Sequence, residues 1–180
     1  MYVEKRTSAK LYNRLRQSAT MGQIKVRDIM TTQVITLLDT DTVKDATITL
    51  AVDELSGAPV VDDDYHLVGI LSEMDILHLI MKFEAELKLE NPVLHLLAFH
   101  MDAKFDDPEL ERAANKFTNT KVKDIMVKDV ITTPPDADVV DTLALMLEKD
   151  INRVPVLEKG VLVGIVTRGD IMFSIYKRKI

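Results

Sequence analysis

Two short segments of the chain carry residue types that could hold a sugar and a phosphate. Each has a glycine within an apolar run, a hydroxyl residue at the end of that run, and an aspartate three positions later. The members are Gly69, Ser72 and Asp75 in the first segment and Gly164, Thr167 and Asp170 in the second. A carboxylate accepts hydrogen bonds from neighbouring hydroxyls, which is how ribose diols are bound. Backbone N–H groups at a helix start favour an anion, so the pattern predicts a ribose-and-phosphate site in two copies.

The same spacing also has a purely local interpretation. Ser72 and Thr167 would be helix N-caps, and Asp75 and Asp170 would be first-turn acids that complement the helix dipole. Because Ser/Thr-x-x-Asp is a common capping pattern, one isolated copy would favour this interpretation. Two copies, each after a glycine-bearing strand and at a matched distance from a proline, favour ligand binding. The glycine in each strand would let a ligand or another backbone come close.

These segments belong to an internal repeat. Residues 25–30 match residues 121–126, and residues 34–36 match residues 130–132, both at an offset of 96. The two β-branched triplets predict short strands. Each repeat is therefore expected to begin with a strand that leads into a helix.

The rest of each repeat follows the same order of elements. Helical spacing of apolar residues predicts helices over 41–55 and 138–149. The candidate N-caps are Thr42 or Asp41 in the first copy and Asp136 or Asp138 in the second. Pro59 and Pro155 follow, and proline is tolerated at the first residue of a strand. The expected hairpin turns and second strands are 62–66 with 67–71 and 158–160 with 161–166.

Segments outside the repeat are less informative. Residues 1–20 are polar and basic, and they are either a frayed tail or an arm that contacts phosphate or a partner. Between the copies, an amphipathic helix is predicted over 75–90, an apolar helix over 93–101 and a third helix over 108–117. Helices this apolar need a surface to bury against, either the repeats or a second subunit.

Composition excludes several classes of function. The chain has 180 residues, 47% of them hydrophobic, a net charge of −6 and no cysteine. Disulfide frameworks, cysteine zinc sites and thiol catalysis are thereby excluded, and an acidic chain is a poor candidate for nucleic-acid binding. No apolar run reaches the ~20 residues of a membrane span, so we expect a cytoplasmic protein. No catalytic or metal-binding constellation is visible, and no cofactor is expected to be required.

The repeats resemble a tandem of CBS domains, the Bateman module. The resemblance rests on Val26-x-Asp28-Ile29-Met30, Pro59-Val60-Val61, the Gly69–Asp75 segment and their counterparts in the second copy. It implies an α+β, sandwich-like fold of two pseudo-symmetric βαββα units. The expected organisation is an N-terminal extension (1–21), CBS domain 1 (22–80), a helical insertion (81–118) and CBS domain 2 (119–180).

The resemblance also implies a ligand. CBS pairs bind adenosyl ligands such as AMP, ADP or ATP, and sometimes S-adenosylmethionine or a dinucleotide. By resemblance, Asp75 and Asp170 hold ribose, while Ser72 and Thr167 lie near ribose or phosphate. The residues expected to flank adenine are Ile35, Thr36, Ala58 and Pro59 in the first copy and Ile131, Thr132, Val154 and Pro155 in the second.

Two arginines distinguish the second copy. Arg153 precedes Val154-Pro155, a segment similar to one in which other family members carry an arginine that meets phosphate. The first copy has Gly57 at that position. By the symmetry of the module, Arg153 would serve the site built on Asp75, so the two sites are expected to be unequal. The alternative is a surface ion pair with Glu148 or Asp150, and Arg168 is expected to face solvent or to make a second phosphate contact.

The sequence therefore predicts a regulatory nucleotide sensor that is not an enzyme. It would act as a homodimer and signal to a protein partner through the helical insertion. The alternative is a dimerisation scaffold with degenerate ligand clefts.

Overall fold

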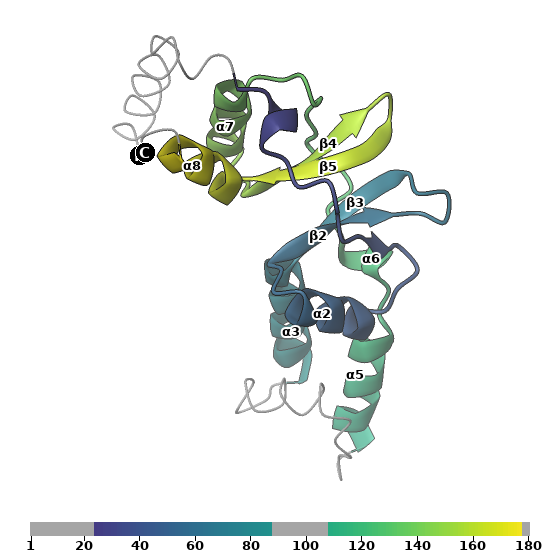
Figure 1. The fold of residues 1–180 in the computed structure, drawn as a ribbon. Helices are drawn as coiled ribbons and strands as arrows, with labels where there is room; N and C mark the ends of the chain where they lie inside the picture. Colours follow the sequence, from purple (N-terminus) through teal and green to yellow (C-terminus); the bar gives the residue numbers. More distant parts are fainter. Residues whose placement is uncertain (1–23, 88–107, 178–180) are drawn as a thin grey trace. The chain divides into compact units, whose positions relative to one another are not determined.

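A computed structural model describes residues 24–87 and 108–177 (Figure 1). A 3-10 turn over Val26–Asp28 comes first, and the remaining elements follow in chain order. They are β1 (Leu37–Leu38), α2 (Val43–Val52), β2 (Gly57–Val61), β3 (Leu67–Ser72), α3 (Glu73–Leu87), α5 (Pro108–Asn119), α6 (Val122–Ile125), α7 (Val139–Glu148), β4 (Arg153–Glu158), β5 (Val161–Thr167) and α8 (Arg168–Lys177). The described residues form two compact units, one of residues 35–87 and 108–130 and one of residues 24–34 and 131–177.

The unit of residues 35–130 is built on a three-stranded sheet of order β1-β2-β3. Strand β1 runs parallel to β2, and β2 pairs antiparallel with β3 through a hairpin. Buried apolar side chains of the strands and of α2, α3, α5 and α6 form a single core. Phe83 of α3 meets Phe117 of α5 edge to face, with ring centroids 5.9 Å apart. Helix α5 therefore buries its apolar face within this unit rather than needing a second subunit.

The second unit repeats this plan with a shorter sheet. Strands β4 and β5 form the antiparallel hairpin, and Thr133 makes a single parallel bridge to Val156. Helices α7 and α8 contribute to its core together with Ile24 and Val26 from the start of the described chain. The first unit thus has a βαββ arrangement followed by a helix, and in the second a single bridge at Thr133 stands in place of the first strand.

The predicted first strands lie in the wrong place. The structure has no strand at 34–36 or 130–132, and pairing begins instead at Leu37 and at Thr133. Leu37 is fully buried, whereas Ile35 keeps 38% of its surface exposed. Strand pairing therefore begins at the first residue whose side chain is buried in the core. The β-branched residues before it precede the strand and do not form part of it.

The helices agree with the prediction more closely. Thr42 Oγ1 accepts a hydrogen bond from Asp45 N, and Asp138 Oδ1 accepts one from Val140 N. Thr42 and Asp138 are therefore the N-caps among the alternatives. Helices α3 and α5 lie at the positions predicted for them, while the helix predicted over 93–101 falls outside the described residues. No helix in 24–87 or 108–177 is long and apolar enough to cross a bilayer.

The opening segment of each repeat packs against the strands of the other repeat. Thr31 exchanges two backbone hydrogen bonds of 2.9 Å with Ile165 of β5, and Val127 exchanges two of 3.0 Å with Ile70 of β3. The residue before each pair is a methionine, Met30 or Met126. Because of this exchange, each compact unit combines parts of both repeats.

The strand glycines are explained by these methionines. A Cβ on Gly69 would lie 2.4 Å from Met126 Sδ. A Cβ on Gly164 would lie 2.6 Å from Met30 Sδ and 3.1 Å from the carbonyl oxygen of Thr31. The predicted close approach of another backbone is seen at Gly164 alone, where the Thr31 carbonyl lies near, whereas Gly69 faces a side chain.

Candidate functional site

The Ser72–Asp75 segment lies where β3 passes into α3 without an intervening loop. Asp75 Oδ2 accepts hydrogen bonds from Ser72 N at 2.8 Å and from Ser72 Oγ at 2.6 Å. The next amide, Glu73 N, donates to the carbonyl oxygen of Ser56 at 3.2 Å. The junction is thus held on both sides, by the first helical turn and by the chain just before β2.

The second copy reproduces this geometry. Asp170 Oδ2 accepts from Thr167 N at 2.8 Å and from Thr167 Oγ1 at 2.7 Å, and Arg168 N donates to the carbonyl oxygen of Asn152 at 3.0 Å. In addition, Asp170 N donates to Thr167 Oγ1 at 3.2 Å. Both junctions therefore show the aspartate half of a capping box, and at Thr167 the hydroxyl also accepts from the helix backbone as an N-cap does.

Capping does not use the whole carboxylate. Every hydrogen bond described for Asp75 and Asp170 goes to Oδ2, and in the described part of the chain none goes to Oδ1. Both side chains are half-buried. An ionised carboxylate has roughly four lone-pair sites. Each aspartate can therefore stay in its cap and still accept from a diol.

A third Ser/Thr-x-x-Asp cap shows that the motif alone is not specific. Thr42 Oγ1 donates to Asp45 Oδ2 at 2.6 Å at the start of α2, while Asp45 is exposed. This cap follows a loop, whereas Ser72 and Thr167 each end the second strand of a hairpin. The position on the sheet, and not the motif, sets the two candidate junctions apart.

The residues predicted to flank adenine fall into one set for each unit. Ile35, Thr36, Ala58 and Pro59 lie with Asp75, and Ile131, Thr132, Val154 and Pro155 lie with Asp170. The side chains of Ala58 and Val154 are fully buried in the two cores. These two residues could offer a ligand only backbone atoms, whereas Ile35, Thr36, Ile131 and Thr132 retain exposed surface.

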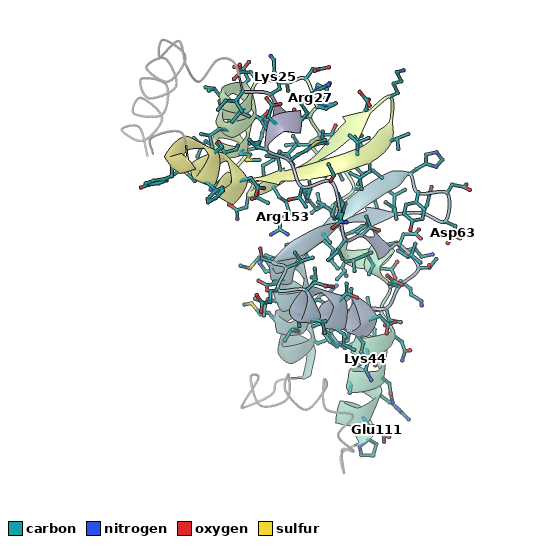
Figure 2. The ribbon with its side chains drawn as sticks, viewed as in Figure 1. Lys25, Arg27, Lys44, Asp63, Glu111 and Arg153 are labelled. Carbon is teal, nitrogen blue, oxygen red and sulfur yellow. The ribbon has the colours of Figure 1, made fainter. Side chains whose placement is uncertain are left out.

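Arg153 is the cross-strand partner of Thr167, and Gly57 is the cross-strand partner of Ser72. Side chains of directly opposite residues share a face of the sheet, so Arg153 lies beside the Thr167–Asp170 junction. Figure 2 shows Arg153 at the end of the β4–β5 hairpin that lies away from its turn. Arg153 belongs to one unit and Asp75 to the other, and service of the Asp75 site by Arg153 stays a prediction.

The carboxylates considered as alternative partners of Arg153 pair with other cations. Glu148 Oε1 lies 3.0 Å from Lys149 Nζ, and Asp150 Oδ1 lies 3.3 Å from Arg168 Nη2. Each of these acids thus already has a basic neighbour.

Arg168 has a structural role that sequence reasoning missed. Its Nε donates to the carbonyl oxygen of Ile151 at 2.9 Å, and Nη2 donates to the carbonyl oxygen of Met146 at 3.1 Å. The guanidinium therefore satisfies acceptors at the C-terminal end of α7, where a cation also complements the helix dipole. The phosphate contact of Arg168 stays a prediction, and these hydrogen bonds give its guanidinium partners within the protein.

No group of three or more histidine or acidic side chains in residues 24–87 and 108–177 is arranged to hold a metal ion. The groups that the candidate sites offer are a carboxylate, a hydroxyl, backbone groups and, in one copy, a guanidinium.

The chain thus contains two repeated units, each with a hairpin that ends in a Ser/Thr–Asp junction. The CBS domain model matches residues 26–82 and 122–177. The chain therefore belongs to the CBS domain family as a tandem pair, which confirms the resemblance and the predicted fold class.

Three uncharacterised proteins of Methanocaldococcus jannaschii are similar to the chain. One of them is 35% identical over 149 residues, covering 82% of this chain and 88% of that protein. Two further proteins of that organism are 31% and 26% identical, but the chain spans only 34% and 40% of their lengths.

Two solved structures share the fold. The CBS domain of a CBS domain-containing membrane protein from Sphaerobacter thermophilus has a TM-score of 0.65 and 28% identity, covering 95% of this chain and 96% of that one. CBSX2 of Arabidopsis thaliana, solved in complex with AMP, has a TM-score of 0.62 and 27% identity, covering 87% of this chain and 98% of that one.

Proposed function

We propose that the chain is a regulatory module that binds an adenine nucleotide, AMP, ADP or ATP, at two sites. The observation that carries the proposal is the paired Ser/Thr–Asp junction at the end of β3 and of β5, in a chain of the CBS family. That CBSX2 binds AMP supports the same class of ligand.

In each proposed site, different residues contact the ribose, the phosphate and the adenine. Asp75 and Asp170 accept from the ribose diol through the oxygen that capping leaves open, and Ser72 and Thr167 lie near ribose or phosphate. Ile35 and Thr36, or Ile131 and Thr132, flank the adenine with exposed side-chain surface. Ala58 with Pro59, and Val154 with Pro155, contribute backbone groups to the base.

The two sites are unequal because their charge differs. The second copy has Arg153 where the first has Gly57, and a guanidinium is suited to phosphate recognition. A site that includes Arg153 is expected to discriminate nucleotides by their phosphates, and a site without it by the nucleoside.

Ligand binding would favour one arrangement of the two units over others, because a ligand shifts an equilibrium by its differential affinity for the states. A protein partner would bind preferentially to the arrangement that the ligand favours. No catalytic step is proposed for this module itself. We also propose that chains pair as homodimers, since α3 and α8 expose Met74, Met81 and Tyr176 and apolar surface of this kind often marks an interface.

Two other functions can be distinguished from adenine-nucleotide binding by experiment. S-adenosylmethionine or a dinucleotide could replace the simple nucleotide, since aspartate and apolar flanks suit any adenosyl group. Alternatively, the module is a dimerisation scaffold with degenerate clefts. In that case substitution of Asp75 and Asp170 would leave partner binding unchanged.

The proposal is tested by isothermal titration of the full chain with AMP, ADP, ATP and S-adenosylmethionine. We expect binding of at least one, weakened about tenfold or more by Asp75→Asn or Asp170→Asn, because a hydrogen bond to a charged group is worth about 1.5–3 kcal/mol. Asp45→Asn is the matched control, since it removes a carboxylate from an equivalent cap outside the candidate sites. Absence of binding by all four at millimolar concentration would refute the ligand assignment.

A further inference from the structure

Two chain segments that carry candidate ligand contacts are also the segments that pass from one unit to the other. Residues 32–36, here called tether 1, contain Ile35 and Thr36. Residues 128–132, here called tether 2, contain Ile131 and Thr132. The boundaries of the compact units fall inside these segments, at 34/35 and 130/131.

Tether 1 is fixed at both ends by backbone hydrogen bonds. Its start follows Thr31, whose N–H and carbonyl both bond to Ile165 of β5 at 2.9 Å. The side chain of Met30, the residue before Thr31, packs against Gly164 of the same strand. Its far end is Leu37, which pairs with Val60 in the other unit.

Tether 2 is fixed in the same way with the units exchanged. Its start follows Val127, which exchanges two bonds of 3.0 Å with Ile70 of β3, beside the contact of Met126 with Gly69. Its far end is Thr133, which donates to the carbonyl oxygen of Pro155 at 3.1 Å and accepts from Leu157 N at 3.0 Å.

The start of each tether is bonded to a strand residue, here called its anchor. This anchor lies on the strand that leads to the site in the opposite unit from the one whose candidate contacts the tether carries. Ile165 belongs to β5, which ends at Thr167, and Ile70 belongs to β3, which ends at Ser72. A ligand held by Ile35 and Thr36 therefore restrains a segment whose opposite end is bonded to the strand of the Asp170 site. The reverse holds for tether 2.

The tethers are also short. A five-residue segment spans at most about 18 Å when fully extended. We therefore expect that ordering or displacing part of a tether strains the backbone hydrogen bonds at its start. These bonds join the tether to Ile165 or Ile70, beside the methionine contact with the strand glycine.

We propose that the two tethers couple the ligand sites, so that occupancy of one site changes the affinity of the other. The inference rests on the proposed nucleotide binding, and it adds a structural path by which binding at one site changes the affinity of the other. The coupling is reciprocal, as linkage requires, and each direction uses its own tether.

The coupling is measured by titrating AMP into the full chain. The Asp170→Asn and Asp75→Asn variants each give the association constant of the remaining site. The coupling factor is the overall two-site constant of the wild type divided by the product of those two constants. We expect a factor that differs from one by about fivefold or more, the lower end of typical allosteric couplings.

Breaking an anchor should bring that factor close to one. Thr31→Pro removes the N–H that donates to Ile165, and Val127→Pro removes the N–H that donates to Ile70. Thr32→Pro and Lys128→Pro are the matched controls, because no hydrogen bond is described for either N–H in this part of the chain. The controls place proline in the same tether and should retain the coupling factor.

If a proline variant does not fold, Met30→Ala and Met126→Ala loosen the same anchors without altering the backbone, and exposed Met81→Ala is their control. Independent sites in the wild type would overturn the inference while leaving the proposed function intact. An equal coupling factor in anchor and control variants would overturn it too. If AMP does not bind, the same titrations use ADP or ATP; if none of the three binds, the proposed function fails, and the coupling fails with it.

Discussion

Arg153 lies directly across the β4–β5 hairpin from Thr167, and the same register places Gly57 across from Ser72 in the other unit. Otherwise the two hairpins pair residue for residue, with Pro59 opposite Ile70 and Pro155 opposite Ile165. The difference in charge therefore occurs at one defined position, beside an arrangement of hydroxyl and carboxylate that the two junctions share. It makes the chemistry of the two sites distinguishable by experiment.

Replacing Arg153 by glycine, the residue of the first copy, should weaken binding of AMP more than binding of adenosine. Loss of a charge-assisted hydrogen bond of about 1.5–3 kcal/mol corresponds to a loss of affinity of roughly ten- to a hundredfold. Titration of both ligands measures the difference. Lys159→Ala removes a cation from the exposed hairpin turn and serves as the control. Equal losses for AMP and adenosine would contradict a phosphate contact.

Gly164→Ala should lower the free energy of unfolding by about 1–3 kcal/mol, as expected for overpacking. The added Cβ would meet Met30 Sδ at 2.6 Å and a backbone carbonyl at 3.1 Å, whereas in Gly69→Ala it would meet only the flexible side chain of Met126. Gly69→Ala should therefore cost less. Urea unfolding measures both variants.

The control for these variants is Gly169→Ala. Its Cβ would meet nothing closer than 3.4 Å, and alanine is preferred to glycine in a helix by about 0.5–1 kcal/mol. This variant should be neutral or stabilising. If Gly164→Ala were equally well tolerated, the methionine contact would not explain the strand glycine.

Phe117→Ala should destabilise the chain by about 3–5 kcal/mol, because truncating a buried aromatic leaves a cavity. Phe117 is 1% exposed and packs edge to face on Phe83. Chemical denaturation would measure the change, and Val52→Ala on the exposed side of α2 is the control. A loss below 1 kcal/mol would mean that α5 does not belong to this core.

The pKa of Asp62 should lie below its usual value of 3.8. The backbone N–H of His66 bonds to the Asp62 carboxylate at 2.8 Å and is the largest cause, followed by partial desolvation, which opposes it. Because the folded pKa is lowered, the stabilisation is present above the unfolded pKa and is lost as pH falls through the folded pKa. An NMR titration of the carboxyl group measures this, and a pKa at or above 3.8 would contradict the turn geometry.

Short-range features of this fold could be predicted from the sequence. The hairpins, the caps at Thr42 and Asp138 and the two Ser/Thr–Asp junctions depend on residues a few positions apart, and each chemical preference acts locally. The internal repeat added information, because the second copy made a common capping pattern informative.

Long-range features could not be predicted in the same way. The exchange of opening segments pairs Thr31 with Ile165, and no local preference encodes that contact. The glycine opposite each methionine was a signal, but a strand glycine fits a ligand as well as a side chain. Arg168 was missed for a related reason, since its partners Met146 and Ile151 become neighbours only after α7 and β5 have packed.

The central claim is that each Ser/Thr–Asp junction builds one adenosyl site. Its most direct test is the stoichiometry of AMP per chain by isothermal titration at saturation, in the wild type and in Asp75→Asn and Asp170→Asn. We predict two AMP molecules per wild-type chain, and in each variant one site that keeps its affinity within the coupling factor and one whose affinity is weaker by about tenfold or more, with circular dichroism spectra unchanged. A wild-type chain that binds none of AMP, ADP and ATP, or variants that bind as many molecules with the same affinity as the wild type, would contradict the account.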